Sequence, residues 1–183
     1  MRSRVSAQAA PLAEAAFRQV MRAWATGVAV LLVPEGGGWQ GMTVNAVTSV
    51  SLDPPSVLVV VARGRAAHTA LVPACGQVFT LSVLAERQAS LADRFARHCV
   101  RYLVAEEAEW TPAGHAVVPG ALGWLDCRVA AAHEAGDHTI VVATVEAGQS
   151  SALDGASPPL LFWAGRYHGG ERLRALATGD PTS

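Results

Sequence analysis

Residues 43–52 alternate between two kinds of side chain, and this pattern constrains the fold more than any other in the chain. One set is mostly apolar: Val44, Ala46, Thr48, Val50 and Leu52. The other mostly carries hydroxyl or amide groups: Thr43, Asn45, Val47, Ser49 and Ser51. A period of two is typical of a β-strand, because successive side chains point to opposite faces of a sheet. The segment therefore predicts one strand whose uncharged polar face suits a flat ligand with polar edges.

The rest of the chain predicts several further short strands and two main helices. The strand over residues 43–52 is expected to end at Asp53, because Pro54 and Pro55 cannot donate a backbone hydrogen bond to a neighbouring strand. Further strands are expected over 27–33, 57–62, 78–83, 122–133, 138–147 and 160–163. Amphipathic helices are expected over 11–25 and 86–98, a short helix or loop over 66–74, and turns over 34–38 and 134–137. This pattern indicates a mainly β (α+β) fold in which helices flank an antiparallel, barrel-like sheet.

Length and composition predict one domain over residues 11–173, with flexible ends at 1–10 and 174–183. Hydrophobic residues make up 51% of the chain and charged residues 16%, which is typical of a globular protein. The net charge of −1 provides no basic surplus for nucleic acid or an anionic membrane. The longest apolar runs have the length of strands, and no secretion signal is evident, so a cytoplasmic protein is expected.

The residue types also exclude several kinds of chemistry. All 14 basic residues are arginines, so no lysine can form a Schiff base with a carbonyl substrate or hold pyridoxal phosphate. The three cysteines, Cys75, Cys99 and Cys127, are widely spaced, which predicts neither a disulfide framework nor a zinc site. The sequence has no nucleophile elbow, no paired-carboxylate motif and no Gly-rich phosphate loop. No metal site is predicted.

Five blocks of the sequence, in order, resemble the short-chain flavin reductase family: 17–33, 41–55 (GMTVNAVTSVSLDPP), 79–96, 136–139 (GDHT) and 159–167 (PLLFWAGRY). Members are split-barrel proteins that bind FMN or FAD and reduce it with NADH or NADPH. The resemblance implies an antiparallel split β-barrel with flanking helices. It also implies a homodimer with flavin near the subunit interface, and a separate monooxygenase that receives the reduced flavin.

The resemblance implies that the polar strand lies along the flavin ring. The residues expected near the ring are Met42, Thr43, Val44, Asn45, Ala46, Val47 and Ser49. In the family, the turn after the third strand holds the flavin phosphate with hydroxyl groups and an arginine. Here that turn has alanines where hydroxyls are expected, so the candidate phosphate ligands are Arg63, Arg65 and the backbone at Ala66. Weaker binding or another flavin is the alternative, and Arg94 is a further candidate ligand.

The resemblance also places residues beside the nicotinamide. His138, in the motif Gly136-Asp137-His138, is expected to orient the nicotinamide or the flavin edge through a hydrogen bond. Thr26 and Gly27 match another position near the nicotinamide, and Tyr167 is a candidate pocket residue. Hydride transfer mainly requires two rings to be held in contact, so no nucleophile is needed. The tryptophans are interpreted mostly as core or subunit-interface residues.

The sequence leaves two alternative functions open. A flavin-binding module without turnover would have the same fold and ligand, because neither establishes activity. A relative of pyridoxamine-phosphate oxidase would use the same kind of barrel, but the missing lysines and the histidine of the GDH motif disfavour it. The choices between FMN and FAD, and between NADH and NADPH, also stay open.

Overall fold

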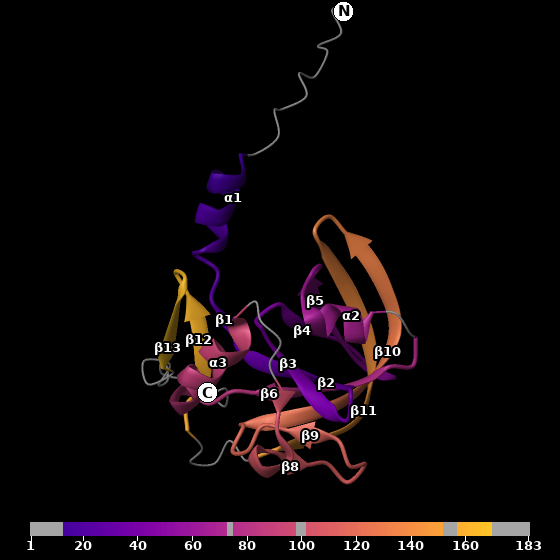
Figure 1. The fold of residues 1–183 in the computed structure, drawn as a ribbon. Helices are drawn as coiled ribbons and strands as arrows, with labels where there is room; N and C mark the ends of the chain where they lie inside the picture. The colour runs from indigo at the N-terminus through magenta and orange to yellow at the C-terminus, as the bar shows by residue number, and fades with distance from the viewer. Residues whose placement is uncertain (1–12, 73–74, 98–101, 152–156, 170–183) are drawn as a thin grey trace, which may run out of the picture.

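An eight-stranded antiparallel sheet forms the centre of the protein (Figure 1). The structure is a computed structural model, and it describes residues 13–72, 75–97, 102–151 and 157–169. Its strands are β2 (Ala29–Glu35), β3 (Gly38–Val44), β4 (Val47–Leu52), β5 (Pro55–Ala62), β6 (Val78–Val83), β7 (Tyr102–Leu103), β10 (Gly123–Ala135) and β11 (His138–Ser150). Their order in the sheet is β4-β5-β11-β10-β6-β2-β3-β7. The predicted flexible ends, 1–10 and 174–183, lie outside the described residues.

Smaller elements flank this sheet. β1 (Thr26–Gly27), β12 (Leu160–Trp163) and β13 (Arg166–Gly169) form a three-stranded sheet, and β8 (Glu109–Trp110) pairs with β9 (Ala116–Val117). The helices are α1 (Glu14–Met21), α2 (Ala66–Leu71) and α3 (Ala89–Ala96), with 3-10 turns η1 (Glu86–Gln88) and η2 (Ala105–Glu107). The predicted mainly β split barrel with flanking helices is confirmed. Within the described residues, no helix has the length and apolar character needed to span a membrane.

Two apolar clusters lie on opposite faces of the sheet and share β2. Leu31 and Val33 point into the barrel, where they pack with Phe79. Val30 and Leu32 point outward and pack under α3. A strand covered on both faces has apolar residues at every position, which is why this run has no polar alternation.

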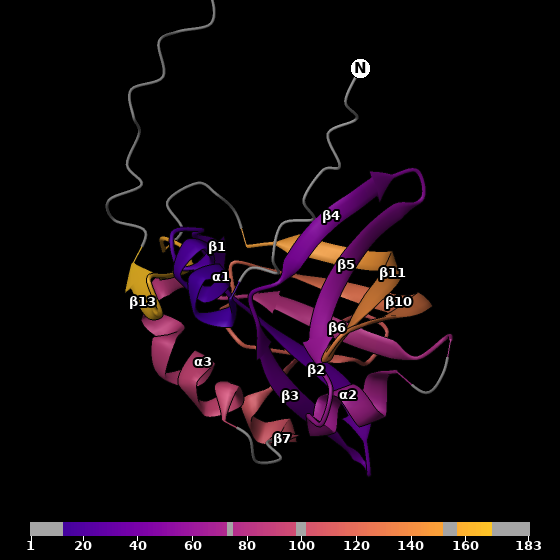
Figure 2. The ribbon, with the colours of Figure 1, turned by 90° about the horizontal axis from the view of Figure 1, so that it is seen from above.

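Helix α3 packs along the outer side of β3 (Figure 2). A Cβ atom at Gly41 would collide with the ring of Phe95, which is itself buried. Two residues further along β3, the Thr43 hydroxyl donates a hydrogen bond of 2.7 Å to the Ala92 carbonyl. The glycine thus allows the close approach, and the hydroxyl fixes the helix in register with the strand.

The single strand expected over 43–52 is in fact two strands, and this prediction was wrong. β3 ends at Val44 and β4 begins at Val47, so Asn45 and Ala46 connect them. Val44 is buried in the barrel, whereas the side chains of β4 are largely exposed, with Leu52 at 92%. β4 is an edge strand that, among the described strands, pairs with β5 alone. The alternation indicates extended chain on both sides of the break but not the break itself.

Several boundaries also differ from the predictions. α1 is shorter than the expected helix over 11–25 and has no buried residue, so its apolar side is not core. The second helix ends at Ala96, and the β10–β11 turn contains only Gly136 and Asp137. β5 starts at Pro55, because a proline is tolerated as the first residue of a strand. β13 was not predicted, since its four residues are too few to show a period.

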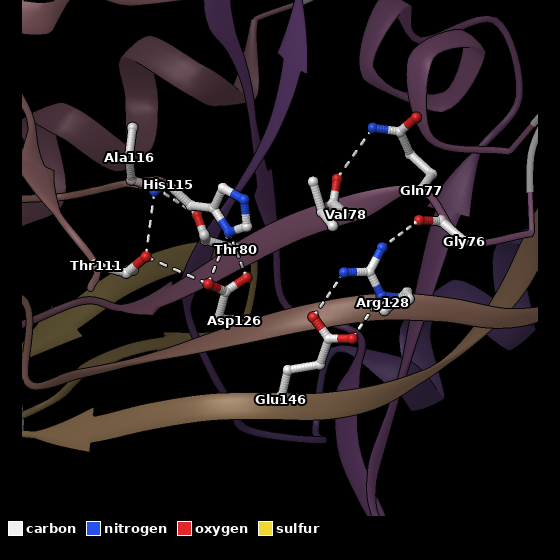
Figure 3. Close-up of polar contacts among 10 residues, drawn as sticks. All are labelled: Gly76, Gln77, Val78, Thr80, Thr111, His115, Ala116, Asp126, Arg128 and Glu146. Carbon is white, nitrogen blue, oxygen red and sulfur yellow. Dashed lines mark hydrogen bonds and ion pairs between the residues drawn. The ribbon is translucent and has the colours of Figure 1, made fainter. Parts of the chain in front are cut away.

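A buried polar contact fastens the loop around β8 and β9 to the outer face of the sheet (Figure 3). Nδ1 of His115 lies 2.7 Å from Oδ2 of Asp126, and the Thr111 hydroxyl donates to the same oxygen at 3.3 Å. Asp126 is 2% exposed. The Thr80 hydroxyl donates to the Ala116 carbonyl at 2.7 Å. These bonds satisfy polar groups that would otherwise be buried without partners.

Candidate functional site

A cavity of about 190 Å³ opens beside the end of β3. It is lined by Val28, Thr43, Asn45, Arg65, Ala96, Phe162 and Tyr167. The lining residues come from β3, α3, β12, β13, the junction between β1 and β2, and the two connections that follow β3 and β5. The cavity therefore joins residues far apart in the sequence, and four of them were predicted site residues.

The polar groups at the β3 end form a connected set. The Asn45 amide donates to the Thr26 hydroxyl at 3.3 Å, which brings β1 to this site. Gly27, the next residue of β1, has open space where a side chain would be. Asn45 is exposed, so its amide oxygen and its second N–H can reach a ligand.

Arg65 supplies the positive charge of the cavity. It directly precedes α2, and its Nη1 donates to the Ala96 carbonyl at 3.1 Å, at the end of α3. Ala66 follows with only a methyl side chain. Arg63 turns the other way, and its Nη2 lies 2.8 Å from Oε2 of Glu134 on β10. Of the two arginines in this turn, the structure brings only Arg65 to the cavity.

The other predicted residues lie around the cavity rather than in its lining. Arg94 pairs with Glu107 at 2.8 Å and donates to the Tyr102 carbonyl at 3.0 Å, so its guanidinium is engaged elsewhere. Met42 and Val44 point into the barrel core and can offer a ligand only their backbone groups. The remaining predicted positions, which are exposed and continue from the cavity edge along the chain, are Ala46, Val47 and Ser49.

His138 is the first residue of β11 and is not part of the cavity lining. Its side chain is 42% exposed, and its Nδ1 lies 2.7 Å from Oδ1 of Asp137. The hydrogen bond from His138, followed by its charge, holds the pKa of Asp137 below the ordinary value. The ionised carboxylate favours a proton on Nδ1, which leaves Nε2 as the acceptor of the neutral ring.

Tyr167 and Phe162 form the aromatic wall of the cavity. Their ring centroids are 5.6 Å apart at an interplanar angle of 62°. Burial, with a smaller contribution from Asp93, raises the pKa of Tyr167, so its hydroxyl remains protonated at neutral pH. Sequence reasoning missed Phe162, Val28 and Ala96 as lining residues. The 159–167 block contains Phe162, so the signal was present in the sequence.

His68 lies on α2, three residues after Arg65. Its Nε2 is 2.9 Å from the Thr139 hydroxyl on β11. Burial, and then the nearby charge of Arg63, lower the pKa of His68 from its ordinary value of 6.5. Both causes disfavour the protonated ring in the folded chain.

This shift predicts that acid weakens the fold. Just below pH 6.5 the unfolded chain binds a proton that folded His68 does not, so the free energy of unfolding should fall as pH falls. We expect urea unfolding at about pH 7.5 and about pH 5.5 to show this loss. In His68→Gln, whose amide can still bond Thr139, the loss should be smaller. Equal losses in the two proteins would contradict the prediction.

The cavity chemistry fits a flavin nucleotide. Amide and hydroxyl groups suit the polar edge of a flavin, the aromatic wall and the small side chain of Ala96 suit a flat ring, and Arg65 suits a phosphate. Among the described residues, no three histidine, cysteine or acidic side chains come together as a metal site would require.

Comparison with known proteins identifies the family. A sequence model described as "Flavin reductase like domain" matches residues 21–171. The FMN reductase (NADH) SmoA of Agrobacterium fabrum is 39% identical over 153 residues, 82% of this chain and 83% of that protein. The styrene monooxygenase flavin reductase SMOB from Pseudomonas putida S12 has a TM-score of 0.71 at 39% identity, covering 84% of this chain and 96% of that chain.

A third relative was solved with ligand fragments. The Streptomyces globisporus C-1027 NADH:FAD oxidoreductase SgcE6, in complex with NAD and FAD fragments, has a TM-score of 0.73 at 30% identity. The match covers 93% of this chain and all of that chain (100%). Taken with the match of the family model over most of the chain, these similarities show that the chain belongs to the flavin reductase family.

Proposed function

We propose that this protein catalyses the NADH-dependent reduction of FMN or FAD and supplies the reduced flavin to a separate monooxygenase. The observation that carries the proposal is the meeting of Asn45, Thr43, Arg65 and Tyr167 around one cavity in a chain of this family. The relatives described above are named for NADH, FMN, FAD and a styrene monooxygenase. NADPH is the alternative hydride donor.

In this proposal the chain positions the two reactants. A bound flavin would accept hydride at its N5 atom from C4 of the reduced nicotinamide. Asn45 and Thr26 would bond the polar edge of the flavin ring, together with backbone groups of residues 42–47. Arg65 would bind the phosphate, and Phe162 and Tyr167 would exclude water from one side. Such positioning alone can lower a reaction barrier substantially.

His138 is proposed to orient the nicotinamide. Asp137 holds Nδ1, and the His138 side chain is 42% exposed, so Nε2 would accept a hydrogen bond from the carboxamide of the nicotinamide. This assigns His138 a role in placing the hydride donor and leaves flavin binding to Asn45 and Arg65.

The test of the proposed function is NADH oxidation by the purified protein with added FMN, FAD or riboflavin. We expect turnover that saturates with a free flavin and a higher KM for NADH in His138→Ala. Flavin binding without turnover would establish the flavin-binding module instead. The absence of both binding and turnover would overturn the proposal.

The proposed phosphate contact makes a separate prediction. Arg65→Ala should weaken FMN binding by about tenfold, the effect of losing one charge-assisted hydrogen bond, and leave riboflavin binding unchanged. Flavin fluorescence titrations measure both constants. Arg94→Ala is the matched control, because Arg94 is bonded to Glu107 and the Tyr102 carbonyl. Equal losses for FMN and riboflavin would show that Arg65 acts only on the fold.

We also propose that two copies of the chain associate through β4. Val50 and Leu52 on this edge strand are 52% and 92% exposed, and an uncovered apolar edge favours pairing with another chain. Light scattering should give the mass of two chains, and a single-chain mass at micromolar concentration would contradict the proposal.

Because the reaction consumes NADH, a cytoplasmic location is proposed as well.

A further inference from the structure

A second cavity, of about 390 Å³, lies between α1 and the β12–β13 hairpin. Figure 1 shows α1 standing above β1 and the β12–β13 hairpin, away from the main sheet. Phe17, Met21 and Trp24 line one side, and Phe162 and Trp163 line the other. The result is a slot with aromatic rings on both sides.

The slot has a defined geometry although α1 is not buried. The backbone N–H of Ala164 donates to the Arg22 carbonyl at 3.1 Å. The indole N–H of Trp163 donates to the Ala23 carbonyl at 3.3 Å. These two bonds join the end of α1 to the hairpin turn and hold the two walls in place.

This slot continues from the flavin cavity. Asn45 and Phe162 line both cavities, and Thr26, the partner of Asn45, lines the second. A ligand bound in the first cavity can therefore extend past Asn45 and Phe162 into the second.

Positive charge lies at the rim of the slot. Arg18 and Arg22 both line it. The guanidinium of Arg22 lies against the Gly165 turn, while Arg18 pairs with Glu14 at 2.6 Å. Aromatic rings beside guanidinium groups suit a flat base joined to phosphates, because bases stack on aromatic rings and arginine binds phosphate oxygens.

We propose that this slot binds the adenylate half of a dinucleotide, with the base between the aromatic walls and the adenylate phosphate at Arg22. The proposal rests on the proposed function, which provides two ligands with this half, NADH and FAD. Exposed apolar residues on α1 could also attract a second copy of the chain. The arginines and the continuity with the flavin cavity favour the nucleotide.

The experiment compares ligands that differ only in the adenylate. Binding of FAD is compared with FMN, and NADH with reduced nicotinamide mononucleotide, by calorimetry and fluorescence titration of wild type, Trp24→Ala and Arg22→Ala. ADP alone serves as a direct probe. Trp24 is 70% exposed, so its removal should not affect folding. Trp110→Ala is the matched control, since Trp110 is also exposed, at 50%, but lies on β8, outside the slot.

We expect each slot variant to weaken ADP binding by about tenfold, the value of one lost stacking or charged contact. The same loss for FAD, with FMN unchanged, would assign the slot to the flavin. The loss for NADH, with the mononucleotide unchanged, would assign it to the hydride donor. Unchanged ADP binding, or equal losses for ligands with and without adenylate, would overturn the proposal. A wild type that reduces no flavin would instead defeat the proposed function.

Discussion

Replacing Asp126 with alanine is expected to lower the free energy of unfolding by about 3 kcal/mol, as removal of one partner from a buried polar pair does. Asp126 is 2% exposed and accepts hydrogen bonds from both His115 and Thr111. Its loss leaves the buried Thr111 hydroxyl, which is 4% exposed, and the partly buried His115 ring without this acceptor. Urea unfolding at neutral pH measures the change.

The control for Asp126→Ala lies beside it on the same sheet (Figure 3). The Glu146 carboxylate on β11 accepts a hydrogen bond of 2.9 Å from Nη2 of Arg128. The side chains of Glu146 and Arg128 are 40% and 45% exposed. Glu146→Ala should therefore cost less than about 1 kcal/mol, as exposed ion pairs do. Equal losses of unfolding free energy in the two variants would show that burial does not determine how much the Asp126 contact stabilises the fold.

Replacing Gly41 with alanine should lower the free energy of unfolding by about 2 kcal/mol, which is typical of overpacking. The added Cβ collides with the Phe95 ring, so α3 must move away from β3. That movement would also strain the bonds of α3 to Thr43 and Arg65, and we expect weaker FMN binding. Thermal or urea unfolding and a flavin titration measure the two effects.

Gly27→Ala provides the comparison for stability, because a Cβ there meets nothing within 4 Å. A double-mutant cycle tests the cause directly. In a Phe95→Leu background, the cost of Gly41→Ala should shrink, because the smaller side chain can move aside. An unchanged cost would show that the collision with Phe95 is not the source of the instability.

Strands and turns could be predicted where a pattern of neighbouring residues is sufficient to determine them. The apolar run of β2 and the turn at Gly136 both depend on nearby residues, and both were predicted, although Gly27 of the expected strand over 27–33 belongs to β1 in another sheet. The break between Val44 and Val47 was not, because the alternation of residue types continues through it. The exposure of β4 depends on which elements cover the sheet edge, and no local pattern reports this.

The site was predicted in part for a similar reason. Resemblance indicated Thr43, Asn45 and Tyr167, which the structure brings to one cavity. It could not separate Arg63 from Arg65, because their directions depend on Glu134 and on the end of α3, both distant in sequence. The five tryptophans were interpreted mostly as core or subunit-interface residues. In the single chain Trp24 and Trp163 are 70% and 48% exposed and line the slot, so these two are not core residues.

The bond between Arg65 and the Ala96 carbonyl has a consequence for the proposed role of Arg65 as a phosphate ligand. A flavin phosphate bound there would share the guanidinium with a backbone carbonyl that is held at high effective concentration. In this proposal the carbonyl would compete with the phosphate and shorten the residence time of the flavin. For an enzyme whose product passes to another protein, a shorter residence time would favour delivery.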